Sequence, residues 1–141
     1  MKYDDASWHY GGDFPAHLNR EAGATHIAMF VTWCLLNGLA GEIHTREFPV
    51  DLEKLKNREE SPGQWFIRCC DEKFTDEDLN ELGNSFAQFY YAAEAAPYLT
   101  EYELSFGEDL PHLYAVPDTW GSYEKLEPQI SAAFAKWMVN G

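Results

Sequence analysis

The sequence contains no lysine or arginine between Lys73 and Lys125, although eleven acidic residues lie in this stretch. Over its 141 residues the chain has 24 acidic and 10 basic side chains, which amounts to a formal net charge of -14. Proteins bind phosphate backbones and anionic lipid surfaces mainly through Lys and Arg. We therefore expect neither nucleic acid nor a membrane as a partner, whereas the acidic stretch would attract a basic protein.

Cysteine is also scarce, with only Cys34 and the adjacent residues Cys69 and Cys70. An odd number of cysteines, two of them adjacent in sequence, does not favour a disulfide framework, and no pair has the spacing of a zinc knuckle. A nucleophilic cysteine needs a nearby base or a helix N-terminus, which the sequence does not display. We expect reduced thiols in the cytoplasm, and we assign no catalytic residue.

Long hydrophobic runs are missing from the chain. The longest covers residues 27–36 and is interrupted by Thr32, so it is too short to span a bilayer. The first residues, Met1 to Asp5, lack the apolar core of a signal peptide. Because 45% of the residues are nevertheless apolar, the chain should fold rather than stay disordered. We expect one cytoplasmic globular domain over residues 1–141, without a cofactor.

Apolar residues recur at helical spacing along much of the chain. The expected helices are a central apolar one over 25–36, a surface one over 51–60, a short one after the Ser61-Pro62 cap, one behind a capping box from Thr75 to Asp78, and one over 122–139 that Pro128 starts late or kinks. Residues 3–15 show no helical period, residues 98–106 fit a helix or a strand, and residues 112–116 are expected to be extended. The predicted fold is mainly α, a compact single-domain helical fold with an extended N-terminal arm, and it allows one small β hairpin.

The helix expected behind Thr75 has the clearest amphipathic pattern. Its helical spacing predicts an apolar stripe facing the core and acidic and amide side chains on the opposite side. The apolar stripe consists of Leu79, Leu82, Phe86, Phe89 and Tyr90. The solvent-facing side includes Asp76, Asn80, Glu81, Asn84 and Gln88.

Several strings of residues are distinctive, namely Tyr3 to Tyr10, Ala24 to Phe30 with Trp33, Asp78 to Asn80, Phe89 to Tyr91, and Val116 to Trp120. Together they resemble a bacterial family of single-domain proteins of unknown function, and the resemblance covers nearly the whole chain. It implies no catalytic residue that could be carried onto these positions. By analogy of size and charge alone, the chain is similar to immunity proteins that neutralise antibacterial toxins.

Asp4, Asp5, His9 and Asp13 are crowded near the N-terminus. Carboxylates and imidazole can together bind a divalent metal or carry out general acid/base chemistry. However, Asp4 and Asp5 would point in opposite directions along an extended chain, and no helical His or Glu motif supplies further ligands. The alternative is that these residues have only a structural role. Trp8 and Tyr10 would then hold the N-terminal arm against the core, and the acids would cap helices or pair with Arg20, Arg46 or Arg68.

His26 lies at the start of the most apolar helix. Burial shifts the pKa of a histidine, so His26 could act as a base in a pocket. The alternative is a structural role in the first helical turn, where the ring would bond a backbone group or a carboxylate from the N-terminus.

We expect a non-enzymatic binding protein that docks a basic protein partner, as an immunity or antitoxin-type inhibitor docks its toxin. Acidic residues would speed the encounter and exposed tyrosines would anchor the complex. The predicted binding residues are Asp76, Asp78, Glu81, Tyr91, Tyr98, Glu101, Tyr102, Glu108 and Asp109.

Two alternatives stay open at this point. The first is a small metal-binding protein or enzyme that uses Asp4, Asp5, His9 and His26. The second is a homo-oligomeric structural subunit whose aromatic surface pairs with itself. The sequence does not identify the partner or the oligomeric state.

Overall fold

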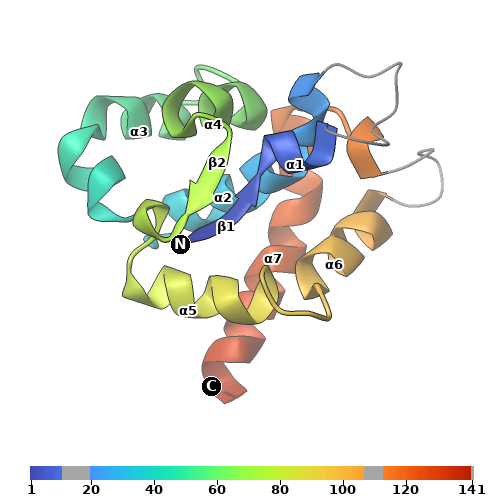
Figure 1. Ribbon diagram of the computed structural model, residues 1–141. Coiled ribbons are helices and arrows are strands. Elements are labelled where there is room, and N and C mark those ends of the chain that lie inside the picture. The colour runs from blue at the N-terminus through green and yellow to red at the C-terminus, as the bar shows by residue number, and fades with distance from the viewer. Residues whose placement is uncertain (11–19, 107–112, 141) are drawn as a thin grey trace.

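The computed structural model describes residues 1–10, 20–106 and 113–140. Its helices surround a two-stranded sheet and the buried helix α2 (Figure 1). In chain order the elements are β1 (Lys2–Asp5), α1 (Ala6–Tyr10), η1 (Arg20–Gly23), α2 (Thr25–Leu36), η2 (Ile43–Glu47), α3 (Pro49–Lys56), α4 (Pro62–Cys70), β2 (Lys73–Thr75), η3 (Asp76–Asp78), α5 (Glu81–Tyr90), α6 (Pro97–Phe106), η4 (Leu113–Ala115) and α7 (Trp120–Asn140). Here η2 is a turn of π-helix, and η1, η3 and η4 are 3-10 turns.

Helix α2 forms the centre of the core. All of its residues from Thr25 to Leu35 are buried, which confirms the central helix expected from its all-round apolar character. At its C-terminus the backbone N–H of Asn37 donates to carbonyl oxygens of the last turn, and Gly38 follows with φ of +80°. Glycine adopts this backbone region without the steric penalty of a side chain, so the helix ends at Leu36, as predicted.

Strand β1 pairs antiparallel with β2, so the N-terminus lies against the middle of the chain. Asp4 lies opposite Phe74, and the ring of Tyr3 packs on Phe74 with centroids 4.9 Å apart. The expected mainly α fold with a small antiparallel sheet is therefore confirmed. The strand pairing also brings the first residues of the chain onto the surface of the core.

Within the described residues 1–10, the N-terminal arm is extended as far as Asp5, and a helix follows. The carboxylate of Asp5 accepts hydrogen bonds from the backbone N–H and the hydroxyl of Ser7, at 2.9 and 2.7 Å, which caps the short helix α1. The expectation that Trp8 pins the arm is wrong, because α1 turns this side chain outward and leaves it 57% exposed. Tyr10 does hold the arm, since its hydroxyl donates to Glu72 at 2.8 Å.

Helices α3 and α4 are present as predicted, although α3 covers Pro49–Lys56 rather than 51–60. Leu52 and Leu55 are the buried anchors of α3, and the side chain of Ser61 caps α4 by accepting from the backbone N–H of Gln64. Asp118 adds to this cap, because its carboxylate accepts from the hydroxyl of Ser61 at 2.5 Å and from the N–H of Gly63 at 2.7 Å. The segment before α7 is thereby fastened to the start of α4.

The register of α5 differs from the expected one. The capping box of Thr75 and Asp78 is present, but it closes the 3-10 turn η3, and α5 begins at Glu81 with Asn80 as its own cap. The break between the two turns rotates the later helix. Phe86 and Tyr90 are buried as predicted, whereas two residues of the expected stripe are largely exposed, Leu82 to 40% and Phe89 to 50%.

The C-terminal third is more helical than the sequence indicated. Residues 98–106, which fitted a helix or a strand, belong to α6, and Leu113–Ala115 form a 3-10 turn where an extended segment was expected. Helix α7 begins at Trp120 and runs through Pro128, so the expected late start at the proline is wrong. Within the described part of the chain, no helix is both long and apolar enough to cross a membrane.

Candidate functional site

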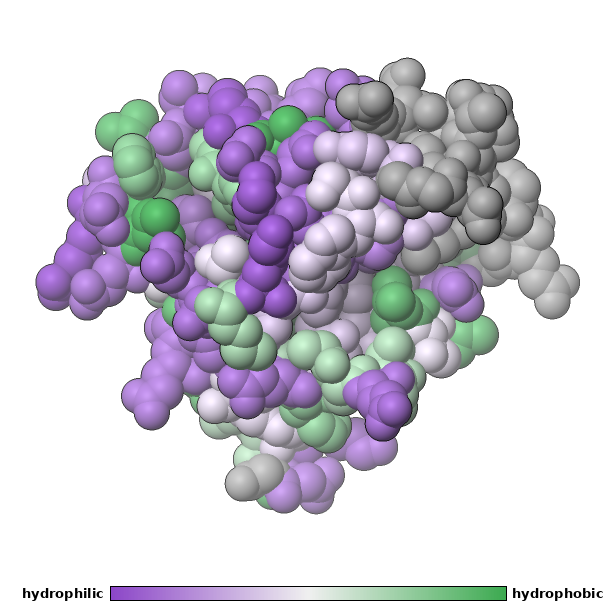
Figure 2. Space-filling model, in the orientation of Figure 1, coloured by the Kyte–Doolittle hydropathy of each residue, from purple (hydrophilic) through white to green (hydrophobic). Residues whose placement is uncertain are grey.

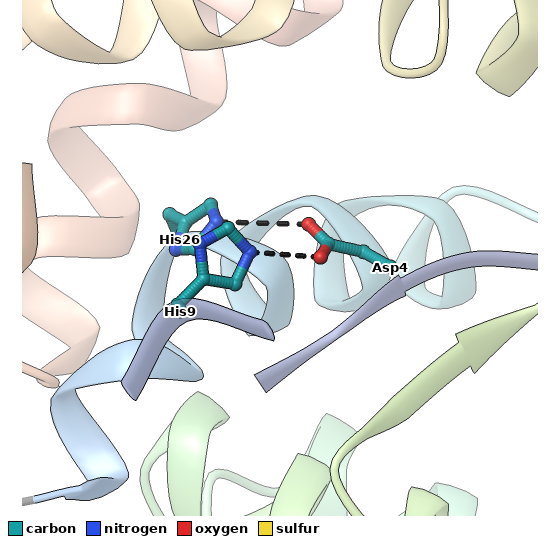
Figure 3. A group of neighbouring side chains, drawn as sticks. All are labelled: Asp4, His9 and His26. Carbon is teal, nitrogen blue, oxygen red and sulfur yellow. Dashed lines mark hydrogen bonds and ion pairs between the residues drawn. The ribbon is translucent and has the colours of Figure 1, made fainter. Parts of the chain in front are cut away.

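Three elements bring Asp4, His9 and His26 together. Asp4 comes from β1, His9 from α1 and His26 from the first turn of α2, and both imidazole rings face the carboxylate (Figure 3). The metal-ligating atoms of the three side chains all lie within 4.8 Å of one another. This group, which we call the Asp4 centre, unites three of the four residues named for a metal or acid/base site.

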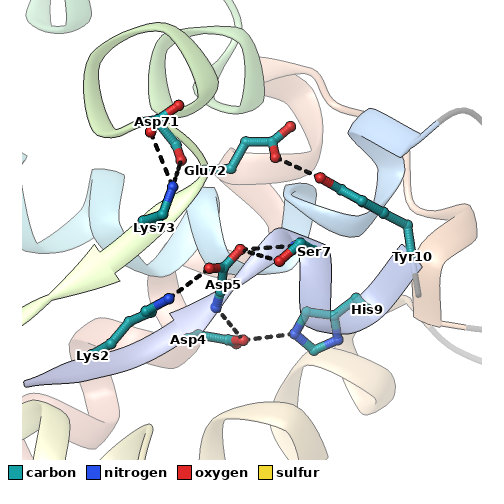
Figure 4. Close-up of polar contacts among 9 residues, drawn as sticks. All are labelled: Lys2, Asp4, Asp5, Ser7, His9, Tyr10, Asp71, Glu72 and Lys73. Carbon is teal, nitrogen blue, oxygen red and sulfur yellow. Dashed lines mark hydrogen bonds and ion pairs between the residues drawn. The ribbon is translucent and has the colours of Figure 1, made fainter. Parts of the chain in front are cut away.

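The extended backbone of β1 separates the two adjacent aspartates (Figure 4). Asp5 turns away from the Asp4 centre and binds the ammonium group of Lys2 at 2.8 Å as well as Ser7. Burial alone would raise the pKa of Asp5, but these partners outweigh it and lower the pKa to about 2. Asp5 therefore has a structural role, and its expected inclusion in the centre is wrong.

The carboxylate of Asp4 reaches both histidines. Its Oδ1 lies 2.8 Å from Nε2 of His9, and its Oδ2 lies 3.7 Å from Nε2 of His26. The two imidazole rings meet edge to face with centroids 4.4 Å apart. The two nitrogens thus approach the two oxygens of one carboxylate, which is a convergent arrangement of ligand atoms.

Two tyrosines orient the side chains of Asp4 and His9. The hydroxyl of Tyr91 donates to Oδ2 of Asp4 at 2.5 Å, and the hydroxyl of Tyr114 lies 2.8 Å from Nδ1 of His9. Contact of Nδ1 with Tyr114 leaves Nε2 of His9 to face Asp4. Such partners around ligands hold the ring orientation and the carboxylate in place.

His26 is the least satisfied member of the Asp4 centre. Its residue is 1% exposed, and neither ring nitrogen has a hydrogen-bond partner among the described residues. The hydroxyl of Tyr102, whose ring centroid lies 6.3 Å from that of His26, is buried without a partner in the same part of the chain. A buried polar group without a hydrogen bond costs about 1–3 kcal/mol, so a ligand that satisfies His26 would stabilise the fold.

The charges of the centre follow from burial and proximity. Burial lowers the pKa of His26, and the neighbouring Asp4 offsets this only in part. For Asp4, burial acts to raise the pKa, but interactions with the two histidines and Tyr91 outweigh it and hold the pKa below its usual range. At neutral pH the centre therefore combines an ionised carboxylate with a neutral His26, which are the protonation states that metal coordination requires.

A cavity lies beside the Asp4 centre. It has a volume of about 860 Å³, and its lining includes Thr25 from the first turn of α2, Tyr114 from η4 and the acidic residues Glu21, Glu60 and Asp118. Tyr114 lines this cavity and also contacts His9, so its side chain lies between the cavity and the Asp4 centre.

The predicted partner-binding residues do not form one surface. Tyr98 and Tyr102 were expected to be exposed anchors, but both are fully buried because α6 lies against the core and the ring of Tyr98 packs on Phe30 at 5.3 Å. Asp78 is 6% exposed, since it closes the capping box and binds Nε2 of His44 at 2.8 Å. These three assignments to a binding surface are wrong.

The remaining predicted residues differ in their exposure. Glu81 is exposed, and Asp76 is partly exposed and pairs with the N-terminal amine at 3.0 Å. Glu101 accepts from the hydroxyl of Tyr90, and Tyr91 is half-buried against Asp4. Glu108 and Asp109 lie outside the described residues, as does Asp13 of the N-terminal cluster.

Neither the cysteines nor the described arginines take part in the Asp4 centre. Cys34 is buried within α2, and burial raises the pKa of its thiol, which suits a core residue rather than a nucleophile. Arg46 pairs with Glu42, and Arg68 pairs with Glu60 and Asp51, so neither arginine is seen to pair with Asp4 or Asp5; Asp5 instead caps a helix, which was the other expected role of the N-terminal acids. The side chain of Arg20 is outside the described part.

Sequence reasoning missed Tyr114 and the contact of Tyr91 with Asp4. Tyr114 lies 105 residues from His9, and Tyr91 lies 87 residues from Asp4. No local pattern connects residues so far apart, and only the packing of η4 and of the C-terminal end of α5 beside α2 brings the tyrosines near the centre.

A family model described as a domain of unknown function, DUF7832, matches residues 2–116, and this range contains the whole Asp4 centre with both tyrosines. No curated protein and no solved structure matches the chain.

Proposed function

The chain belongs to DUF7832, a family of domains of unknown function, and we propose from the geometry of the site that it binds a divalent transition metal ion through Asp4, His9 and His26. The observation that carries this proposal is the state of His26. Its ring is buried and neutral, lacks a hydrogen-bond partner among the described residues, and points Nε2 toward a carboxylate 3.7 Å away. A metal ion between these groups would satisfy both.

The distances support a tetrahedral ion of the zinc type. With zinc bonds of roughly 2.0–2.2 Å to nitrogen and oxygen, neighbouring ligand atoms lie about 3.3 Å apart. In the protein, Asp4 lies 2.8 Å from His9 and 3.7 Å from His26, so small side-chain shifts would accommodate the ion. Imidazole and carboxylate together suit Zn²⁺ among the common biological cations.

Three protein ligands leave one position of a tetrahedral ion for water or a substrate, as in catalytic zinc sites. A metal at this position would act as a Lewis acid and lower the pKa of bound water. Tyr114 lies between His9 and the neighbouring cavity, so a solute in that cavity would reach the ion only if Tyr114 moved aside. We therefore expect the centre to bind metal reversibly, with small molecules reaching the ion only after such a movement.

Calorimetric titration with Zn²⁺ tests the proposal, using protein treated with a chelator and then dialysed. We expect a binding event in the wild-type protein that weakens by roughly 100-fold or more in the Asp4→Asn variant. Loss of a residue that only hydrogen-bonds to a metal ligand costs about 10–100-fold in metal affinity, so removal of a charged ligand itself should cost at least as much. The His9→Gln variant should behave like Asp4→Asn.

The matched control is Asp5→Asn, which removes a carboxylate one residue away whose side chain faces Lys2 and Ser7. This variant should keep the wild-type affinity. The proposal would be refuted if the wild-type protein bound no Zn²⁺, or if Asp4→Asn and Asp5→Asn bound it equally well. In either case a buried water molecule would remain as the group that satisfies His26.

A second candidate function is the docking of a basic protein, as an immunity or antitoxin-type inhibitor would do. The observation that favours it is an exposed apolar pair on α5, Leu82 and Phe89, on the same helix as the exposed acid Glu81 and close in sequence to Glu77. On the face shown in Figure 2, green residues lie over the lower half with purple residues between them, and a purple strip runs through the centre. Apolar anchors with an acidic border suit a partner that presents an apolar patch within a basic rim.

A further inference from the structure

A second cluster of metal-ligating side chains lies apart from the Asp4 centre and consists of His44, Cys70 and Asp78. Nε2 of His44 lies 2.8 Å from Oδ1 of Asp78, and Sγ of Cys70 lies 3.7 Å from the same oxygen. All three ligand atoms lie within 4.8 Å of one another. A nitrogen, a sulfur and an oxygen from η2, α4 and η3 therefore converge on one point.

The backbone around this cluster holds the ligands in fixed positions. The N–H of Gly41 donates to the carbonyl oxygen of Asp78 at 2.9 Å, and the N–H of His44 donates to the carbonyl oxygen of Gly41 at 3.0 Å. Gly41 approaches η3 so closely that an added Cβ would lie 2.3 Å from the carbonyl oxygen of Glu77. The other oxygen of Asp78 accepts from the N–H of Thr75 at 2.9 Å. The segments that carry His44 and Asp78 are thus joined by their backbones, which favours a pre-organised site.

Burial and charge limit what the cluster can bind. His44 is 4% and Asp78 is 6% exposed, and the ring of Trp65 covers His44 with centroids 5.5 Å apart. A buried charge is costly unless it is compensated. A divalent ion with one thiolate, one carboxylate and one neutral imidazole has no net charge, whereas a monovalent ion would leave an excess negative charge. Sulfur and nitrogen ligands also favour Zn²⁺ over Mg²⁺ or Ca²⁺.

We propose that His44, Cys70 and Asp78 bind a thiophilic divalent transition metal ion such as Zn²⁺. The ion would tie η2 and η3 to the C-terminal end of α4 and replace the direct contacts that Asp78 now makes with His44 and Cys70. Cys70 would bind as the thiolate, with its proton released to solvent on binding. This site is independent of the Asp4 centre, because the two share no residue.

Cobalt spectroscopy tests the second site by itself. Co²⁺ replaces Zn²⁺ in tetrahedral sites, and a cobalt–thiolate bond gives a charge-transfer band in the near ultraviolet, which the Asp4 centre cannot produce because it has no sulfur ligand. We expect this band in the wild-type protein and in the Asp4→Asn variant. It should be lost in Cys70→Ser and kept in Cys69→Ser, whose substitution removes the neighbouring thiol. Absence of the band from the wild-type protein, or its survival in Cys70→Ser, would overturn the proposal.

Alkylation provides a readout that needs no variant. Peptide mass spectrometry after iodoacetamide treatment reports the modification of Cys69 and Cys70 separately. We expect saturating Zn²⁺ to slow the modification of Cys70 at least tenfold while that of Cys69 changes little. Equal rates for Cys70 with and without Zn²⁺ would contradict the site. The two proposed sites can also fail separately. If the Asp4 centre bound no Zn²⁺ but the cobalt–thiolate band persisted in Asp4→Asn, the proposed function would be refuted and the site at His44, Cys70 and Asp78 would stand.

Discussion

Gly63 lies in the first turn of α4, where the carboxylate of Asp118 occupies the space beside its Cα. An added Cβ would lie 2.5 and 2.8 Å from the two carboxylate oxygens. The same carboxylate accepts from the N–H of Gly63 and from the hydroxyl of Ser61, so the helix start depends on this close approach. A single hydrogen atom as side chain thus permits a contact between segments 55 residues apart.

We expect Gly63→Ala to lower the free energy of unfolding by roughly 1–3 kcal/mol, because Asp118 must withdraw and leave helix N–H groups without their partner. The control is Gly121→Ala in the first turn of α7, where the nearest atom would be 3.7 Å from the new Cβ. That change should be neutral or stabilise by up to about 1 kcal/mol through helix propensity. Urea unfolding followed by circular dichroism measures both. Equal effects of the two changes would contradict the role assigned to Asp118.

Helix α5 owes its orientation to a break in the chain after the capping box. Asn80 starts a new helix at Glu81, and its side chain accepts from the N–H of Gly83 at 2.8 Å. Gly83 lies close to Leu39, so a small residue is needed where α5 meets the segment after α2. As a result, Phe86 enters the core while Phe89 stays half exposed.

The two phenylalanines provide a matched test of this register. Phe86→Ala should lower the free energy of unfolding by about 3–5 kcal/mol, because it leaves a cavity among Phe30, Trp33 and Phe134. Phe89→Ala should lower it by less than about 1.5 kcal/mol, since the side chain is 50% exposed and its ring contact is with Trp137. Chemical denaturation of the two variants gives the difference. Losses of similar size would restore the continuous stripe expected from the sequence.

The whole molecule carries a net charge of -14, and its exposed acids are the surface that a basic partner would meet first. Glu77 and Glu81 are exposed near Leu82 in sequence, and neither forms an ion pair with a described residue. Charges of this kind speed encounter with an oppositely charged protein, and salt screens the effect. The position of the acidic residues on the surface, rather than the total charge of the protein, should therefore decide the rate of association with a basic partner.

We expect the paired variant Glu77→Gln and Glu81→Gln to slow association with a basic partner captured from the native host, and the wild-type rate to fall as salt rises. The control pair, Glu47→Gln and Glu59→Gln, changes the net charge equally at exposed sites near the ends of α3. Surface plasmon resonance measures both rates. Equal slowing would mean that net charge alone matters, and unchanged rates in both pairs would leave the acids a role in solubility.

Local patterns in the sequence predicted much of the fold. The apolar stretch from Thr25, the Ser61 cap and the capping box at Thr75 all depend on contacts within a few residues. Such contacts follow from helical spacing and from the backbone groups that helix ends leave unpaired. The break after the capping box escaped the same reasoning, because Asn80 and Thr75 are both good caps and the choice of register depends on what α5 packs against.

The sequence by itself determined the mainly α fold, the central helix and the acidic character of the surface, since these depend on composition and short-range spacing. It also brought Asp4, His9 and His26 forward as candidates, but it did not distinguish Asp4 from Asp5 or place the tyrosines. Only the tertiary structure decided that β1 pairs with β2, that His26 is buried beside Asp4, and that Tyr98 lies inside. Burial and convergence of side chains result from packing between distant segments, which no local pattern encodes.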